Sequence, residues 1–177
     1  PYSPQEQADY LRAAQTVRSV RRRRELTALV CLMMGAGLTG GEFAKARWDD
    51  ITTNDGKVLV TIPARQRTIP VLTAFAPTLL ALSQEHPHGR ILVNRSDNAV
   101  SEAVAYARGH GMDGFTTWRA TNTWRVFQLS RVPAAVAVGA VGITAGHLAG
   151  LLAYVAKPTS DQLELLWDGD TCEGGEQ

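Results

Sequence analysis

Hydrophobic residues fill nearly every position from 26 to 34, and glycines interrupt the pattern directly afterwards. A helix that is apolar on all sides belongs in the centre of a core, so we expect a central helix over residues 25–36. The glycines between 35 and 41 predict a tight corner. Apolar residues then recur at helical spacing from Phe43, which predicts a second helix ending at residues 48–51.

A strand pattern follows this second helix. Asn54-Asp55-Gly56 is typical of a hairpin turn, and residues 58–62 then alternate between apolar and polar side chains. After a turn at residues 64–66, a second strand is expected over residues 67–71. The sequence therefore predicts a small antiparallel sheet in a chain that is otherwise mainly α-helical.

The remaining periodic segments predict helices. Ser3, Pro4 and Glu6 form a capping-box start for a helix that runs to about residue 18. Four further helices are expected over residues 73–83, 96–108, 120–129 and 133–141. A chain of 177 residues suits one domain, and we place it at residues 1–155, followed by an acidic tail over residues 156–177.

Charge is unevenly distributed along the chain. The formal net charge is +1, but residues 156–177 hold one lysine and six acids, a net charge of −5 that leaves +6 on the rest. A basic body with an acidic tail is typical of anion-binding domains. Four consecutive arginines at 21–24 precede the central helix. They are either the solvated start of this helix or paired with a compensating anion. The second alternative follows because cations at a helix N-terminus oppose the helix dipole.

Several classes of protein are disfavoured by the sequence. Cys31 and Cys172 do not form a disulfide framework, which favours a reduced, intracellular setting. Residues 132–155 carry no formal charge, but Pro133 and four glycines within the run favour two short buried helices over a membrane span. His86 and His88 flank a proline on a polar turn without further ligands at metal-site spacing, so we expect these histidines to be exposed and predict no metal site and no cofactor.

The order of central helix, glycine corner, Asp50-Ile51 and β-hairpin resembles the opening of the catalytic domain of the tyrosine recombinases, or phage integrases. That family has roughly G-x-G-L-R-x-x-E-L at the corner, and Thr39 stands in the place of its first catalytic arginine. Thr116-Thr117-Trp118-Arg119-Ala120-Thr121 is similar to the family's H-x-L-R-H-T. By this resemblance Arg119 matches the second arginine, and Thr116 replaces a histidine.

The resemblance also indicates what is missing or displaced. Ile143 occupies the place of the histidine in the family's L-G-H, and the family's lysine near the strand turn is replaced by Arg65 and Arg67. Tyr154 is the candidate nucleophile. It lies two residues beyond the position expected from Ile143, and two before the position expected if His147 is the family's histidine.

These residues leave three interpretations open. In the first, the chain is a degenerate recombinase-like domain without catalytic activity, which serves a phage or mobile-element protein as a domain that binds double-stranded DNA or as a regulatory domain. Its expected phosphate contacts are Arg65, Arg67, Arg119, Arg125 and Arg131. In the second, it is an active site-specific recombinase, with Tyr154 as the nucleophile and Arg119 as the phosphate clamp. In the third, it is a protein-interaction module on the same fold.

The first interpretation also carries expectations about partners and location. In the integrases the segment after the tyrosine often docks on a neighbouring subunit, so the resemblance implies that the acidic tail either self-associates in this way or folds back over the basic cleft. We expect a bacterial or phage-encoded protein of the cytoplasm, associated with the nucleoid if it binds DNA, and no association with a membrane.

Overall fold

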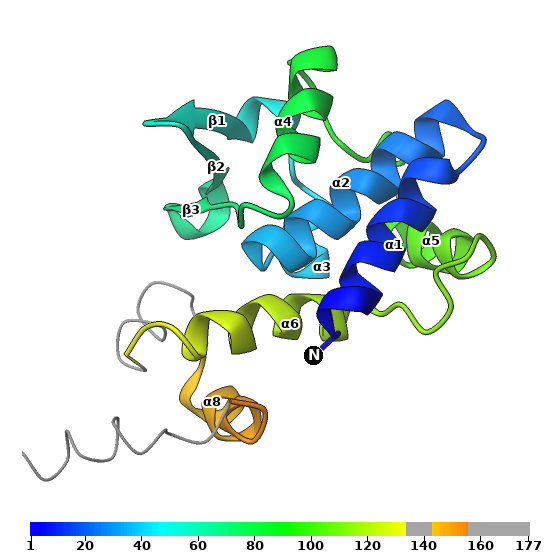
Figure 1. Cartoon of the computed structure of the whole chain (residues 1–177). Helices are drawn as coiled ribbons and strands as arrows, with labels where there is room; N and C mark the ends of the chain where they lie inside the picture. The colour runs from blue at the N-terminus through cyan, green and yellow to red at the C-terminus, as the bar shows by residue number, and fades with distance from the viewer. Residues whose placement is uncertain (134–142, 156–177) are drawn as a thin grey trace, which may run out of the picture.

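The central feature of the computed structural model, which describes residues 1–133 and 143–155, is the helix α2, Val20–Ala36. Every residue of α2 from Glu25 onward is buried, as the apolar sequence predicts. Figure 1 shows α2 in the middle of the molecule, with helices around it. It packs against α1 (Pro4–Thr16), α4 (Ala76–Glu85), α5 (Ala99–Arg108) and α6 (Thr117–Leu129).

The first helix begins as predicted. The Ser3 hydroxyl accepts a hydrogen bond from the Glu6 N–H, and the Glu6 carboxylate accepts one from the Ser3 N–H at 2.7 Å, which completes the capping box. The central helix begins earlier than predicted, because Ser19 caps it and draws the arginines at 21–24 into its first turns.

The compensating anion for these arginines is Glu25, which is 1% exposed. Its carboxylate lies 3.1 Å from Arg22 Nη1 and 3.8 Å from Arg21 Nε. It also accepts a hydrogen bond from the Val93 N–H, which ties a distant loop to α2. A buried carboxylate requires such partners, and part of the arginine run is therefore neutralised inside the domain.

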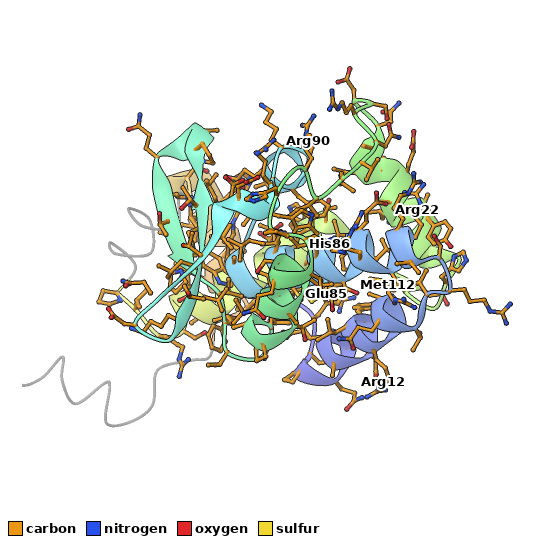
Figure 2. All side chains as sticks on the ribbon, turned by 90° about the horizontal axis from the view of Figure 1, so that it is seen from above. Arg12, Arg22, Glu85, His86, Arg90 and Met112 are labelled. Carbon is orange, nitrogen blue, oxygen red and sulfur yellow. The ribbon has the colours of Figure 1, made fainter. Side chains whose placement is uncertain are left out.

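The loop after α4 confirms the predicted exposure of His88 but not that of His86. His88 is exposed and lies 2.8 Å from Asp49 Oδ1. His86 is half-buried, with Nε2 3.1 Å from Arg24 Nη1 and its ring against Trp48. In Figure 2, His86 lies with Glu85 at the end of α4.

The helix predicted after the glycine corner is much shorter in the structure. α3 spans only Gly40–Phe43, and a 3₁₀ turn, η1 (Trp48–Asp50), leads into the strand β1 (Ile51–Asn54). Two glycines weaken a helix at this point. In addition, the Asp50 carboxylate accepts the Arg47 N–H at 2.9 Å and begins the new turn. The prediction of a helix reaching Ile51 is therefore wrong.

The small antiparallel sheet is confirmed, with strands in the order β1-β2-β3. β2 spans Lys57–Ile62 and β3 spans Arg67–Pro70, with the 3₁₀ turn η2 (Pro63–Arg65) between them. Val60 pairs with Ile51 on one side and with Ile69 on the other. Asp55 and Gly56 have φ of 47° and 72°, the conformation of the two-residue hairpin turn that the sequence predicts.

The other helices differ from the predictions mainly at their ends. α4 and α5 begin three residues later than expected, and α6 begins three residues earlier because Thr116 caps it. A short helix, α8 (Ala145–Leu152), packs against α6 and lies below it in Figure 1. Of the described helices, none combines the length and the hydropathy needed to cross a membrane. The tail from 156 and nearly all of the helix predicted over 133–141 lie outside the described residues.

Burial makes Cys31 a test of how tightly the core closes around α2. Its side chain is fully buried, which raises the pKa of the thiol to about 12. In a Cys172→Ser chain, where Cys31 is the only thiol, we expect no reaction with a thiol-specific disulfide reagent at pH 8 and full reaction after denaturation. Absorbance of the released thiolate measures both. Rapid reaction of the native protein would contradict the close packing of α2.

Candidate functional site

The end of α2 is locked against α6 by a close contact. Gly37 closes α2 with φ of 69°, the left-handed conformation that glycine adopts readily. A Cβ atom at this position would lie 2.1 Å from Cε3 of Trp124 on α6. The Thr121 hydroxyl adds a buried hydrogen bond of 2.7 Å to the Leu38 carbonyl. These contacts place Thr39 near the start of α6.

Thr39, which the resemblance places at the position of the first arginine of the tyrosine recombinases, caps α3. Its hydroxyl accepts the Glu42 N–H at 3.3 Å and donates to Glu42 Oε2 at 2.8 Å, and its own N–H donates to the same oxygen at 2.7 Å. The hydroxyl is therefore engaged in a capping box. The Thr-x-x-Glu spacing of Thr39 and Glu42 is the sequence signal for this role.

Arg67 lies beside this cap. Its Nη2 is 3.4 Å from Glu42 Oε1, and the two side chains are only 14% and 8% exposed. A hollow of about 530 Å³ adjoins the pair, and its charged lining residues are Glu42, Lys45, Arg47 and Asp50. Two acids and two bases line the hollow, so it has little net attraction for a phosphate.

Thr116 also caps a helix. Its hydroxyl accepts the Arg119 N–H at 3.1 Å at the start of α6, and its own N–H donates to the Tyr2 hydroxyl at 2.8 Å. Thr39 and Thr116 therefore both stabilise the start of a helix, a role for which the β-hydroxyl is suited.

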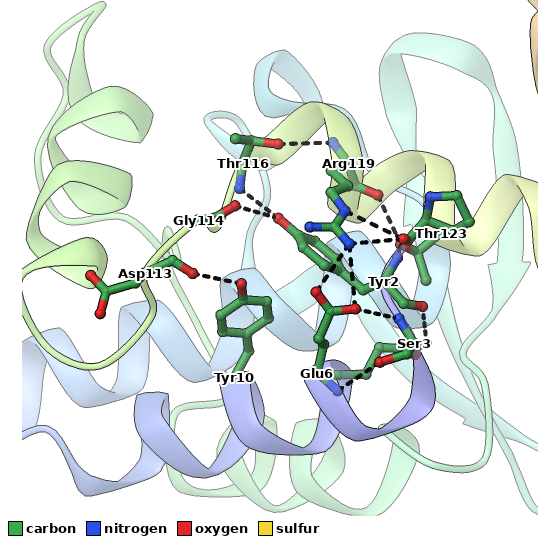
Figure 3. A network of polar contacts seen from close by, with 11 residues as sticks. Tyr2, Ser3, Glu6, Tyr10, Asp113, Gly114, Thr116, Arg119 and Thr123 are labelled. Atoms are coloured by element: carbon green, nitrogen blue, oxygen red, sulfur yellow. Dashed lines mark hydrogen bonds and ion pairs between the residues drawn. The ribbon is translucent and has the colours of Figure 1, made fainter.

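Arg119 projects from the first turn of α6 toward the N-terminal residues, as Figure 3 shows. Its Nη2 lies 3.0 Å and 3.3 Å from the two carboxylate oxygens of Glu6 and donates to the Pro1 carbonyl at 3.2 Å. The guanidinium carbon is 4.1 Å from the centre of the Tyr2 ring. The pKa of Glu6 is lowered, first by the Ser3 N–H and also by Arg119.

Arg119 and Tyr154 line one cleft of about 710 Å³ between α6 and the C-terminal end of the described chain. The α6 side includes Trp118, Arg119 and Asn122, and the opposite side includes His147, Leu151 and Tyr154. Trp118 is 66% exposed and Tyr154 is 58% exposed. The cleft thus brings together a guanidinium, an imidazole and a phenol between largely apolar walls.

The two alternative positions for the family's second histidine lie in different environments. The Ile143 side chain is 3% exposed and belongs to the core. His147 is exposed in the cleft, with Nδ1 2.9 Å from the Thr144 hydroxyl. His147 is therefore the residue that the structure places in the same cleft as Tyr154.

The other predicted phosphate contacts are dispersed. Arg125 is half-buried and donates to Asn122 Oδ1 at 3.2 Å. Arg131 is exposed, with its guanidinium 4.8 Å from the centre of the Phe127 ring. The backbone of Arg65 ends η2, while its side chain is outside the description. Among the residues described here, no three His, Cys, Asp or Glu side chains gather to hold a metal ion.

Comparison with solved structures identifies the fold. The chain superposes on the XerA recombinase with a TM-score of 0.63 and 11% identity, covering 94% of this chain and 63% of that one. It superposes on the XerH site-specific recombinase, solved with its palindromic difH substrate in a post-cleavage complex, with a TM-score of 0.61 and 13% identity, covering 94% and 52%. No protein-family model and no curated protein matches the sequence.

The predicted fold class is therefore confirmed. The chain has a tyrosine-recombinase-like fold, mainly helical with a three-stranded antiparallel sheet. It spans less than two thirds of the length of either recombinase.

The contact between Gly37 and Trp124 can be tested by adding one methyl group. Gly37→Ala forces a left-handed alanine and displaces the indole, so we expect a loss of about 2–5 kcal/mol in the free energy of unfolding. Gly41→Ala is the matched control, because its Cβ would have no neighbour within 4 Å, and its change should stay within about 1 kcal/mol. Urea denaturation measures both, and equal stability of the two variants would contradict the close contact.

Proposed function

We propose that this chain is a recombinase-like domain that binds duplex DNA through the Arg119 cleft without cutting it. The supporting observation is that Arg119 stands half-exposed in an open cleft at the start of α6. An arginine fork is suited to phosphate oxygens. The XerH recombinase of similar fold was solved with its difH substrate, which supports DNA as the partner.

The absence of strand cleavage is proposed from the roles of the two threonines. Transfer of a phosphoryl group to tyrosine requires cations on the nonbridging oxygens and a proton donor for the leaving oxygen. Thr39 and Thr116 supply neither, and their hydroxyls are engaged in caps. Loss of one charge-stabilising donor commonly costs about 3–4 kcal/mol in the barrier, so losing several is incompatible with ordinary turnover.

A working recombinase is the second candidate, favoured by one observation. His147 and Tyr154 share the cleft with Arg119, which brings a nucleophile, a proton carrier and one phosphate ligand together. A protein-interaction module is the third candidate. It is favoured by the exposed apolar side chains of Trp118, Leu152 and Tyr154 around the same region.

DNA binding should depend on salt in a way that Arg119 controls. We expect affinity for a random duplex to fall steeply with salt, and Arg119→Ala to reduce the slope of log K against log salt by about one unit. Arg12→Ala is the matched control, because Arg12 is 69% exposed and paired with Asp9 on α1, and Figure 2 shows it on the outer side of that helix. Fluorescence anisotropy measures each slope, and failure to bind even at low salt would favour the interaction module.

Cleavage can be tested with a nicked suicide duplex, which traps any covalent tyrosyl-DNA intermediate. We expect no adduct that survives denaturant, because the developing charge on the phosphorane would lack cations. The assay is run on the longest available form of the protein, with Tyr154→Phe beside it. A trapped adduct that Tyr154→Phe abolishes would establish the active recombinase instead.

A further inference from the structure

The first residues of the chain are held firmly against the start of α6. Tyr2 is 3% exposed, and its ring lies 5.0 Å from Tyr10 and 6.1 Å from Phe115, between ring centres. Its hydroxyl donates to the Gly114 carbonyl at 3.0 Å, and its N–H donates to the Thr123 hydroxyl at 2.7 Å. Tyr2 is therefore a buried anchor that fixes where α1 begins.

This anchor brings Glu6 to Arg119. Glu6 lies in the first turn of α1, and the Ser3 N–H holds its Oε2 at 2.7 Å. From that position both carboxylate oxygens reach Nη2 of Arg119, as Figure 3 shows. The Pro1 carbonyl accepts from both Nε and Nη2 of Arg119 at 3.3 Å and 3.2 Å. The guanidinium thus faces oxygen acceptors supplied by its own chain.

A carboxylate and a phosphate use the same N–H groups of an arginine, because both present oxygen acceptors at similar spacing. A DNA phosphate on Nε and Nη2 of Arg119 would therefore meet donors that already have acceptors. It would also approach the negative charge of Glu6 at close range, which is unfavourable.

We propose that the Glu6 carboxylate is a built-in competitor that occupies the position of a DNA phosphate on Arg119 and must leave before Arg119 binds DNA. This inference rests on the proposed DNA binding and names how that site is regulated. The competing group is a side chain, and the helix that carries it remains in place through Tyr2.

The exposure of the Glu6 and Arg119 side chains to solvent allows a phosphate to replace the Glu6 carboxylate on Arg119. Arg119 and Glu6 are each 38% exposed, and an ion pair in contact with water contributes little to stability. Tyr2, by contrast, is buried with its hydroxyl and N–H both bonded. A rotation of the Glu6 side chain is therefore enough to remove the carboxylate and its negative charge from Nη2 of Arg119, while the Pro1 carbonyl stays in place. Release of the whole segment would instead expose an aromatic cluster.

The test is Glu6→Gln, because glutamine can complete a capping box as glutamate does and removes only the charge. We expect affinity for a random duplex at low salt to rise about two- to fivefold, the scale of an exposed ion pair. Asp9→Asn is the matched control, since it removes one negative charge from the same helix, where Asp9 pairs with Arg12 and not with Arg119. Its affinity should change by less than about 1.5-fold. Thermal unfolding confirms that both variants remain folded.

A second experiment measures the effect of Glu6→Gln on DNA affinity in a chain that also carries Arg119→Ala. If Glu6 acts through Arg119, the gain from Glu6→Gln disappears in the Arg119→Ala chain, whereas a general change in charge would persist there. Two results would overturn the competition but leave DNA binding intact. In the first, the wild type binds DNA and Glu6→Gln does not raise its affinity. In the second, Asp9→Asn raises the affinity as much as Glu6→Gln does. Absence of binding by both the wild type and Glu6→Gln overturns DNA binding itself, so the two failures are distinguishable.

Discussion

The contact between the end of α2 and the middle of α6 determines where the candidate site lies. Gly37 brings its backbone against the Trp124 indole at a distance that any side chain would prevent, and the Thr121 hydroxyl bonds the next carbonyl. α2 is buried along its length from Glu25, so it cannot shift to accommodate a change at this point. The position of α6 therefore follows from α2, and Arg119 and the cleft follow from α6.

Charge in this domain is balanced locally, and the balance matters more for its function than the net charge does. Glu25 neutralises Arg22 in the core, Glu42 pairs with Arg67 beside the sheet, and Glu6 pairs with Arg119 at the cleft. Each pair removes a cation from the field that a DNA backbone would experience. A net charge of +6 on residues 1–155 therefore overstates the number of arginines ready to bind phosphate. The Arg119–Glu6 pair, with both side chains 38% exposed, is open enough to exchange with an external anion.

Thr39 and Thr116 stand where the resemblance to the tyrosine recombinases places an arginine and a histidine. An arginine at a helix start places a cation near the positive end of the helix dipole, whereas a threonine there satisfies a free N–H. Thr39 and Thr116 each make such a cap. In this chain both side chains therefore stabilise the start of a helix. Because the caps hold α3 and α6 in place, the cleft keeps its shape around Arg119 and Tyr154.

The sequence by itself determined the central helix, the glycine corner, the hairpin turn at Asp55-Gly56 and a mainly helical chain with a small sheet, because each depends on local periodicity or on a required positive φ. The recombinase-like fold was predicted from the resemblance of the sequence to a known family. The sequence did not determine the length of α3, because the Asp50 cap and the pairing of Ile51 with Val60 override helical spacing. Only the tertiary structure brought Arg119 and Glu6 together, since these residues lie far apart in the chain and meet through the Tyr2 anchor. It also placed His147 in the same cleft as Tyr154 and buried Ile143 in the core, because packing of the chain around α8 decides which side chains reach the cleft.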